Sequence, residues 1–499
     1  GIQSLSESLL EARRHEFSQK QIHNATILVL DSRSAEVRAA VGNFDFWDRA
    51  HGGQIAGFWV ERSPGSTLKP VLYAMGLDKR LFLPSTLVPD VPVNFRGFSP
   101  RNFDQKFNGL IAMEDALAHS LNIPFVNLLN KVGVEELLTT LRRMGVRSPK
   151  ELQGYYGLSA IIGGIEITAE EIAGVYATLA RGGEYLPVRW LSSREGTPLM
   201  KPVAIFDSGA TWLTSQTLVI RDRPDFPNRR NVSNETGGVR WKTGTSFGQR
   251  DAWAVGYGKA HTAVVWFGNF DNSSSSALVG SETAAPLLFD LLEALDGRDG
   301  TAATGKIPPN IGHLQVCAFS GMPAGEACEQ KRTVLAFNDR LPVGSCPYHV
   351  HVDVDIRTQK ALTPMCRLGR KYETRSFLRL PTDVRRWLAD TAQNLPESPK
   401  LADFCTRRGG NEKAKIKSPE EGQVVLLMSG IDPSQQKIAL EAELPPESEQ
   451  VSWFVNGKFL GSTTAHERLW WVPELGDHEV AASDENGMVS RRKFKVRAP

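Results

Sequence analysis

Hydrophobic positions at helical spacing begin the chain, and strand-like runs follow them within the first 42 residues. One helical stripe runs through residues 4–18 and consists of Leu5, Leu9, Leu10 and Phe17. Two runs typical of strands follow, at residues 24–31 and 35–42, separated by a polar turn. The pattern predicts a helix and then a β-hairpin.

Helical periodicity dominates the middle of the chain. It predicts helices at residues 68–77, 113–121, 126–132 and 134–144. The periodicity then changes to strands, at residues 239–245, 252–257 and 262–267, and a helical run at residues 284–295 follows. Strands at both ends with helices between them predict an α+β fold, an antiparallel sheet packed against helices.

The rest of the chain differs in character. Residues 301–415 are rich in cysteine and turn residues, and we expect an irregular connecting segment with one amphipathic helix at 383–392. Residues 416–499 alternate again, with a tight-turn signal at Asn456-Gly457. About six short strands predict a small all-β sandwich of immunoglobulin-like type. Its expected core residues are Trp453, Trp470 or Trp471.

Length and composition bound the answer. With 499 residues, the chain is long enough for roughly two to four domains. We predict a linker helix remnant at 1–20, the α+β domain at 21–300, the connecting segment at 301–415 and the sandwich at 416–499. Because the chain enters on a helical stripe without an initiator methionine, we expect a truncated or processed fragment.

Charge and hydropathy exclude some classes of function. The net charge of +2, with 41% hydrophobic and 23% charged residues, gives no global excess that would favour nucleic acid or anionic lipid. No apolar run approaches the roughly 20 residues that a membrane-spanning helix needs. The first residues also lack the features of a signal peptide. The sequence therefore predicts a soluble chain.

All five cysteines lie in one segment, and they are Cys317, Cys328, Cys346, Cys366 and Cys405. Three interpretations stay open: disulfides in an oxidising compartment, a zinc site that uses Cys346 with His349 or His351, and buried thiols. Close Cys-x-x-Cys spacings typical of structural zinc are absent. An odd count leaves at least one cysteine outside any disulfide.

A Ser-x-x-Lys pattern at Ser66 and Lys69 follows a Pro-Gly turn at the expected start of a helix. A serine hydroxyl needs a base to take its proton, and a lysine can be that base where burial and nearby cations lower its pKa. The same pattern recurs at Ser434 to Lys437 and at Ser490 to Lys493, where nothing else supports catalysis. A helix start exposed to solvent is the alternative for a lone match.

Two further motifs accompany this pair. Ser120 and Asn122 end a helical stretch just before Pro124, which fits a loop facing a cleft or an ordinary helix C-cap. A run on a predicted strand offers a lysine, two hydroxyls and a glycine that lets a ligand backbone approach, and it comprises Lys242, Thr243, Gly244 and Thr245. The backbone N–H groups of Ser66 and Thr245 could then form an oxyanion hole.

The three motifs, in this order, resemble the transpeptidase half of class A penicillin-binding proteins. The resemblance rests on SPGSTLKP at 63–70, RNFD at 101–104, SLNIP at 120–124 and KTGTSFGQRDAWA at 242–254. It is strongest over residues 20–300. The cysteine segment and final β domain are similar to the C-terminal extension of one subgroup.

The resemblance implies a penicillin-binding/serine β-lactamase-like fold and a role for each motif residue. Ser66 is the expected acylated nucleophile, Lys69 its general base, and Ser120 and Asn122 the second catalytic element. The strand facing the substrate comprises Lys242, Thr243, Gly244, Thr245 and Ser246. No cofactor and no metal are expected in the reaction.

The family also implies substrates, partners and a location. The expected donor is a peptidoglycan stem peptide ending in D-Ala-D-Ala, and an amine of a neighbouring stem peptide resolves the acyl-enzyme. β-Lactams would acylate Ser66. The expected location is the periplasmic side of the bacterial inner membrane, with the membrane anchor and glycosyltransferase half of the family missing here. A periplasmic α2-macroglobulin-like protein is an expected partner.

Two alternatives remain at this stage. A D,D-carboxypeptidase or β-lactamase shares the motifs but uses water for deacylation, and Glu166 is the candidate for the extra base it would need. The Gly-Gly-Ile-Glu run around Glu166 also reads as a plain helix start. The second alternative is a weakly active scaffold whose β domain recruits partners.

Overall fold

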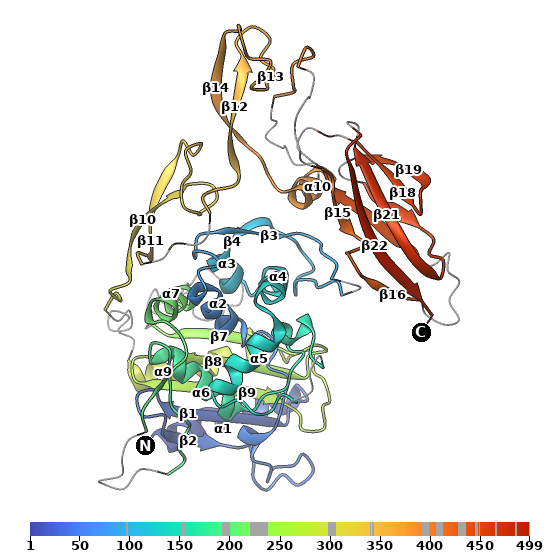
Figure 1. Ribbon diagram of the computed structural model, residues 1–499. Helices are drawn as coiled ribbons and strands as arrows, with labels where there is room; N and C mark the ends of the chain where they lie inside the picture. The colour runs from blue at the N-terminus through green and yellow to red at the C-terminus, as the bar shows by residue number, and fades with distance from the viewer. Residues whose placement is uncertain are drawn as a thin grey trace. The chain divides into compact units, whose positions relative to one another are not determined.

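A five-stranded antiparallel sheet lies at the centre of the N-terminal part of the chain in the computed structural model (Figure 1). In sheet order its strands are β2 (Val37–Val41), β1 (Asn24–Asp31), β9 (His261–Gly268), β8 (Asp251–Tyr257) and β7 (Arg240–Thr245). Pairing of β1 with β9 joins the strands that precede the helices to those that follow them. The predicted α+β fold is confirmed.

The structure describes most of the chain. The described residues are 1–95, 98–150, 155–191, 200–219, 238–297, 306–339, 341, 344–391, 399–405, 413–427, 436–444, 448, 450–464, 467–484 and 487–498. They form two compact units, Gly1–Cys346 and Pro347–Pro499. The finer four-part division expected from the sequence stays a prediction. Among the described helices, none combines the length and apolarity needed to cross a membrane.

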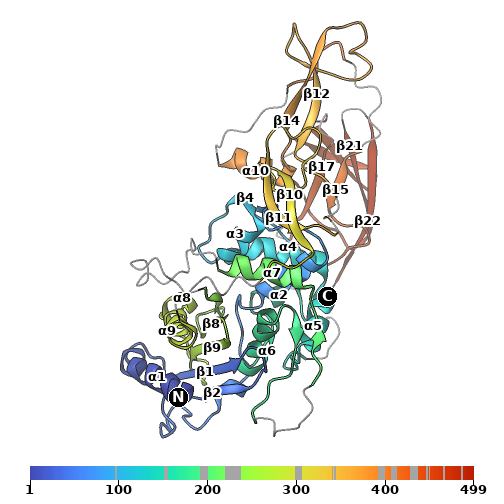
Figure 2. The same cartoon turned by 90° about the vertical axis from the view of Figure 1, so that its left-hand side faces the viewer.

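The central sheet is covered on both faces, and successive side chains of each strand pack alternately against one cover and the other. Ile27 and Val29 of β1 pack in one apolar cluster with residues of α1 (Ile2–Gln19) and α9 (Ala285–Asp296). Leu28 and Leu30, which point the opposite way, pack in a second cluster with residues of the helices that lie between β2 and β7 along the chain. Figure 2 shows α8 (Gly280–Thr283) and α9 on one side of β8 and β9, and α6 (Ala169–Ala180) on the other. Each fully buried aliphatic side chain contributes about 1.5–3 kcal/mol.

The helices of the second cluster include the two that begin at the motif residues Lys69 and Asn122. They are α2 (Lys69–Asp78), α3 (Met113–Ala118), α4 (Asn122–Val132), α5 (Val134–Arg143), α6 and α7 (Ser208–Leu218). The predicted helix at 68–77 is confirmed. The predicted start of α4 was wrong by four residues, because Pro124 falls in the first turn, where the missing N–H is not needed.

Short elements complete the N-terminal unit. These are the hairpin β3 (Leu87–Asp90) with β4 (Gly109–Ala112), the pair β5 (Glu184–Tyr185) with β6 (Val203–Ala204), and the 3₁₀ turns at Gly57–Trp59 and Leu158–Ile162. A further hairpin, β10 (Ile311–Cys317) with β11 (Lys331–Phe337), lies in the segment expected to be irregular. The Arg80 guanidinium lies 3.3 Å from the Phe337 ring centroid, so this hairpin belongs with the N-terminal unit.

The second unit is mostly β. It begins with β12 (His349–Asp355), β13 (Ala361–Leu362), β14 (Tyr372–Leu378) and α10 (Thr382–Asp390). Two further sheets follow, ordered β15-β17-β20 and β16-β22-β21-β18-β19. Their strands are β15 (Lys415–Ser418), β16 (Val424–Leu426), β17 (Ile438–Glu443), β18 (Gln450–Val455), β19 (Lys458–Thr464), β20 (Leu469–Trp471), β21 (Gly476–Asp484) and β22 (Val489–Arg497).

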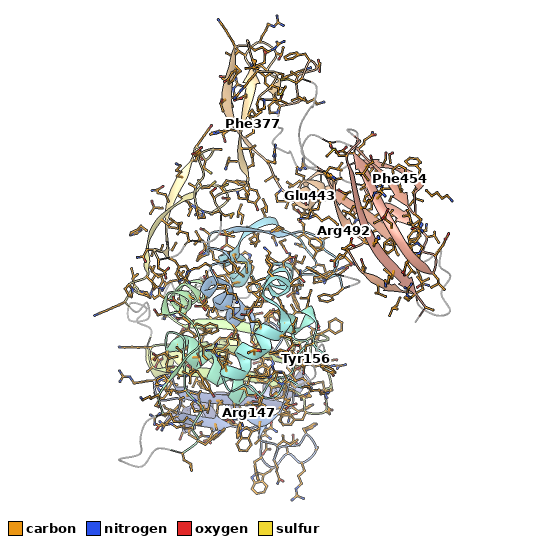
Figure 3. All side chains as sticks on the ribbon, in the orientation of Figure 1. Arg147, Tyr156, Phe377, Glu443, Phe454 and Arg492 are labelled. Atoms are coloured by element: carbon orange, nitrogen blue, oxygen red, sulfur yellow. A yellow bond between two sulfur atoms is a disulfide. The ribbon has the colours of Figure 1, made fainter. Side chains whose placement is uncertain are left out.

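Two sheets share one core here, and their immunoglobulin-like type stays a prediction. Trp453 is fully buried in that core, as expected, whereas Trp470 is 56% exposed, so its assignment to the core was wrong. Trp471 is partly buried against the same cluster. Phe454 of β18 packs beside Phe459 across the Asn456-Gly457 turn, with ring centroids 5.4 Å apart (Figure 3).

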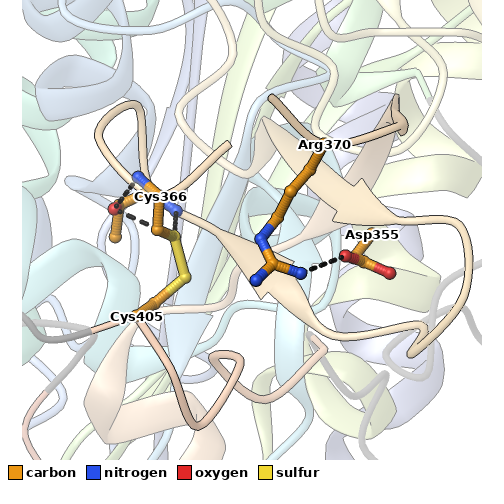
Figure 4. The surroundings of a disulfide bond; sticks show 5 residues. Asp355, Cys366, Arg370 and Cys405 are labelled. Atoms are coloured by element: carbon orange, nitrogen blue, oxygen red, sulfur yellow. Dashed lines mark hydrogen bonds and ion pairs between the residues drawn. A yellow bond between two sulfur atoms is a disulfide. The ribbon is translucent and has the colours of Figure 1, made fainter. Parts of the chain in front are cut away.

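One disulfide joins Cys366 to Cys405 within the second unit (Figure 4). Their Cα atoms lie 5.5 Å apart, within the normal range for a disulfide. Arg370 pairs with Asp355 beside it, at 3.6 Å. The disulfide interpretation therefore holds for these two cysteines. Cys317, Cys328 and Cys346 are thiols.

Candidate active site

Ser66 lies on a tight turn that leads directly into α2. Gly65 has a left-handed backbone with φ of +54°, the N–H of Thr67 donates to Pro64 O at 3.2 Å, and that of Lys69 donates to Ser66 O at 3.2 Å. The helix itself begins at Lys69, so Ser66 stands just before it rather than inside it. Ser66 is only half-buried, which leaves it open to a ligand.

Hydrogen bonds to three other parts of the N-terminal unit hold this turn in place. The indole N–H of Trp253 donates to Ser63 O at 2.9 Å, and the Ser63 hydroxyl donates to Gly163 O at 2.8 Å. The phenol of Tyr176, on α6, donates to Thr67 O at 2.7 Å. The turn that carries the candidate nucleophile is therefore fixed against the sheet and α6.

The Lys69 amine links the first motif to the second. Its side chain is fully buried, and Nζ donates to Ser120 O at 2.6 Å and to Asn122 Oδ1 at 2.7 Å. It also lies 5.6 Å from the centroid of the Phe125 ring. Burial disfavours the charged form of an amine, which is the condition that a lysine base requires.

Ser120 occupies the junction between α3 and α4 in a strained conformation. Its φ is +57°, in the left-handed region that few residues other than glycine adopt. Such a conformation costs about 1–3 kcal/mol and persists where the surroundings enforce it. The expectation of a C-cap was incomplete, because Leu121 is already the N-cap of α4.

Lys242 connects the third motif to the second. Its side chain is also fully buried, and Nζ donates to Ser120 Oγ at 2.8 Å and to Thr243 O at 2.9 Å. Ser120 therefore accepts from one lysine through its carbonyl and from the other through its hydroxyl. All three motifs meet at this residue.

The first and third motifs also touch directly through glycines. A Cβ placed on Gly65 would lie 2.6 Å from Thr245 O and 2.7 Å from Thr245 N. A Cβ placed on Gly244 would lie 2.2 Å from Pro64 O. The expected reason for Gly244, approach of a ligand backbone, is thus incomplete, because the protein's own Pro64-Gly65 turn already occupies that side of the strand.

The hydroxyls of the β7 motif have different surroundings. The N–H of Gly280 donates to Thr245 Oγ1 at 3.0 Å, and Thr243 is buried. Ser246 is buried too, and its Oγ accepts from the N–H groups of Arg250 and Asp251, at 3.2 and 2.9 Å. The Ser246 hydroxyl therefore supports the β7–β8 turn, and its contact with a substrate stays a prediction.

A buried carboxylate lies behind that turn. Burial raises the pKa of the Asp251 carboxyl, while Arg62, at 3.7 Å, and a hydrogen bond with Ser246 oppose this shift. Trp266 donates to Asp251 Oδ1 at 3.0 Å. The turn at the end of β7 thus rests on a buried polar cluster.

A buried polar chain that the sequence did not reveal holds the second motif. Asn122 N–H donates to Asn102 Oδ1 at 2.8 Å, and the Asn102 amide donates to both carboxylate oxygens of Asp90 at 3.0 Å. Asn102 is 2% exposed and Asp90 is fully buried. The Asn122 amide itself donates to Arg101 O at 2.6 Å. Asn102 stands in the motif RNFD, but only its burial indicates this supporting role.

Glu166 is exposed and lies outside this hydrogen-bonded group. Its interpretation as the start of a helix was wrong, because α6 begins at Ala169 and Thr168 is its N-cap. Thr168 accepts from the N–H of Glu171, and the Glu171 carboxylate accepts from the N–H of Thr168.

Substitution of Gly244 tests the packing of β7 against the nucleophile turn. Gly244→Ala should lower the free energy of unfolding by about 1–3 kcal/mol, because the new methyl group meets backbone atoms that must shift. Gly157→Ala is the matched control, since Gly157 has φ of −103° and nothing within 4 Å of the added Cβ. Urea denaturation measures both, and equal stability of the two variants would contradict the described contact.

Two families match this chain. The penicillin binding protein transpeptidase domain matches residues 25–293, and the Penicillin-Binding Protein C-terminus Family matches residues 405–494. The first match covers more than half of the chain and includes all three motifs.

Individual proteins extend the likeness. Penicillin-binding protein 1C of Escherichia coli (strain K12) is 26% identical over 487 residues, which cover 94% of this chain and 60% of that protein. Penicillin-binding protein 1F of Bacillus subtilis (strain 168) is 26% identical over 300 residues, 57% of this chain and 40% of that protein. The chain thus spans 60% or less of the length of these relatives.

A solved structure shows the same fold. Penicillin-binding protein 1A from Haemophilus influenzae superposes with a TM-score of 0.53 at 18% identity, covering 65% of this chain and 54% of that one. The expected resemblance to class A penicillin-binding proteins, and to the 1C subgroup in particular, is confirmed. This chain belongs to the penicillin-binding protein transpeptidase domain family.

Proposed function

We propose that this chain is a peptidoglycan D,D-transpeptidase that works through an acyl-serine at Ser66. The observation that carries the proposal is the hydrogen-bonded group formed by the Lys69, Ser120, Asn122 and Lys242 side chains and backbone beside the Ser66 turn. Family membership supports transpeptidase chemistry. The roles of individual residues and the D-Ala-D-Ala substrate are part of the proposal.

Acylation uses the buried amine and the turn. Lys69, in its neutral form, takes the proton of the Ser66 hydroxyl while Ser66 Oγ attacks the carbonyl carbon of the penultimate D-Ala. The backbone N–H groups of Ser66 and Thr245 stabilise the oxyanion of the tetrahedral intermediate. Contact of Gly65 with Thr245 supports this pairing of amides.

Release of the terminal D-Ala needs a proton on its amine. Ser120 can donate that proton and be reprotonated by Lys242, whose Nζ lies 2.8 Å from Ser120 Oγ. An amine from a neighbouring stem peptide then attacks the acyl carbon and forms the new peptide bond. The proton that the amine loses passes through Ser120 to Lys242, and Ser66 takes its own proton back from Lys69 as the acyl bond breaks. A β-lactam would stop at the first step, with its ring-opened acyl group on Ser66.

Recognition of the donor peptide uses the edge of the sheet. Because β7 is the last strand in the sheet order, an extended peptide backbone can pair with its outer side. The Thr245 hydroxyl accepts from Gly280 and still has its own proton to donate, which suits the terminal carboxylate. Lys242 adds positive charge beside it.

The hydrolytic alternative lacks a comparable observation. Glu166, its candidate base, is exposed and precedes the cap of α6. The scaffold alternative and the α2-macroglobulin-like partner stay predictions, as does the periplasmic location. Co-purification tests that partner directly.

The nucleophile is identified by intact mass after incubation with benzylpenicillin. The wild-type chain should gain one penicilloyl group, and Ser66→Ala should gain none, because the neighbouring hydroxyls of Ser63 and Thr67 donate to Gly163 O and Pro64 O and serve the turn itself. Ser490→Ala is the matched control, since Ser490 belongs to another Ser-x-x-Lys pattern, on β22, and should leave the adduct unchanged. An adduct that persists in Ser66→Ala would place the nucleophile elsewhere.

Turnover of nitrocefin separates a transpeptidase from a β-lactamase. We expect one equivalent of nitrocefin to be opened and then a stable acyl-enzyme, since Glu166, the candidate base for deacylation, is exposed and lies outside the hydrogen-bonded group of motif residues. A spectrophotometric time course would show a single burst. Rapid steady turnover would instead support the β-lactamase alternative.

The Asp90–Asn102–Asn122 chain should set the acylation rate through the second motif. Asn102→Ala removes the acceptor of the Asn122 N–H and a donor to buried Asp90, at a cost of about 1–3 kcal/mol, and we expect acylation roughly 10- to 100-fold slower. Asn108→Ala also removes an amide donor to Asp90 but leaves Asn122 untouched, so its rate should stay within about threefold of wild type. The rate of penicillin labelling is followed by intact mass. Equal rates in the two variants would argue against positioning through Asn122.

A further inference from the structure

Three cysteine thiols converge at one point of the N-terminal unit, and none of them belongs to the three motifs. Cys317, Cys328 and Cys346 are all buried, with exposures of 0%, 3% and 7%, and their sulfur atoms lie within 4.8 Å of one another. They come from positions spread over thirty residues of sequence. The proposed acyl transfer uses none of them.

The backbone holds each of these cysteines in place. Cys317 ends β10, and its N–H donates to Met322 O at 2.8 Å. Cys346 donates from its N–H to Pro323 O at 2.8 Å, which brings the end of this segment back to the same turn. The Cys328 N–H donates to Gly325 O at 3.1 Å. The convergence is therefore built by main-chain hydrogen bonds and does not depend on long, flexible side chains.

The chemistry of this donor set fits zinc. A zinc ion about 2.3 Å from each thiolate holds tetrahedral sulfurs roughly 3.8 Å apart, so ligands within 4.8 Å need only a small contraction. The N–H of Ser320 points at Cys317 Sγ, at 3.4 Å, as outer-shell donors do in thiolate sites. A disulfide would join two of the three cysteines and would not account for the position of the third.

A fourth ligand follows directly along the chain. His349 comes three residues after Cys346, so the backbone itself keeps its imidazole within reach of the thiols. Three thiolates and one imidazole form one of the usual ligand sets of closed, structural zinc sites. We propose that Cys317, Cys328, Cys346 and His349 bind one zinc ion with a structural role.

Such an ion would lock the 317–323 turn against the unit that carries the site. The Ser85 hydroxyl donates to Gly321 O at 2.9 Å, and the N–H of Leu87 donates to Ser320 O at 2.8 Å. Leu87 begins β3, and the same strand ends at Asp90, which holds Asn102. The zinc site would thus stabilise β3, the strand whose last residue, Asp90, begins the hydrogen-bonded series through Asn102 to Asn122.

Metal content of the whole chain tests the proposal. Protein expressed with added zinc and purified under reducing conditions should contain about one zinc per chain by mass spectrometry of the metal. Cys346→Ser and His349→Ala should lose zinc, with affinity falling by more than the roughly 10- to 100-fold typical of an outer-shell partner. His351→Ala is the matched control on the same strand, and the double variant Cys366→Ser with Cys405→Ser is the control for the disulfide. Both controls should retain zinc.

Cobalt substitution keeps the test decisive if a cysteine variant fails to fold, which circular dichroism will reveal. The wild-type chain, stripped by a chelator and given Co²⁺, should show thiolate-to-cobalt charge transfer and the intense visible bands of a tetrahedral site. Chelation should also lower its thermal unfolding midpoint. Reduced wild-type protein that binds neither metal, zinc that is unchanged in folded Cys346→Ser, or a mass showing a second disulfide among the three cysteines would each overturn the proposal.

Discussion

The buried amine of Lys69 is the interaction on which the rest of the site depends. An amine without exposure must have hydrogen-bond acceptors, because an unpaired buried charge or donor costs several kcal/mol. Its acceptors are Ser120 O and Asn122 Oδ1, both on the junction between α3 and α4. Satisfying that single group therefore fixes the distance between α2 and this junction, and with it the position of the candidate nucleophile.

A second constraint acts between backbones. The turn before α2 packs so closely on β7 that neither Gly65 nor Gly244 has room for a side chain. Lys69 thus holds the turn from the helical side, and the glycines hold it from the side of the sheet. The left-handed conformation of Ser120 belongs to the turn that ends α3, where the Ser120 N–H donates to Leu117 O at 3.1 Å and the Leu121 N–H donates to Ala116 O at 2.9 Å. Lysines bind the same residue through its carbonyl and its hydroxyl.

Sequence patterns located the strands of the central sheet and α2 closely, because each has a strong period and a clear boundary. The predictions were wrong where the same local pattern is compatible with two structures. A proline can end a helix or stand in its first turn, and Pro124 lies in the first turn of α4. Trp470 alternates like a core residue but lies on the exposed face of β20. The strands β10 and β12 were missed because turn residues and histidines mask their alternation. The links from Asp90 through Asn102 depend on tertiary contacts, which no local pattern encodes.

Strand β7 ends the sheet, and this has a consequence for selectivity. A peptide that adds to an edge strand is read through its amides and carbonyls, which every residue shares. Discrimination must then come from backbone geometry and chirality, and side chains pointing away from the edge can vary at little cost. Such a surface suits a partner whose composition changes while its main-chain direction and terminal group stay the same.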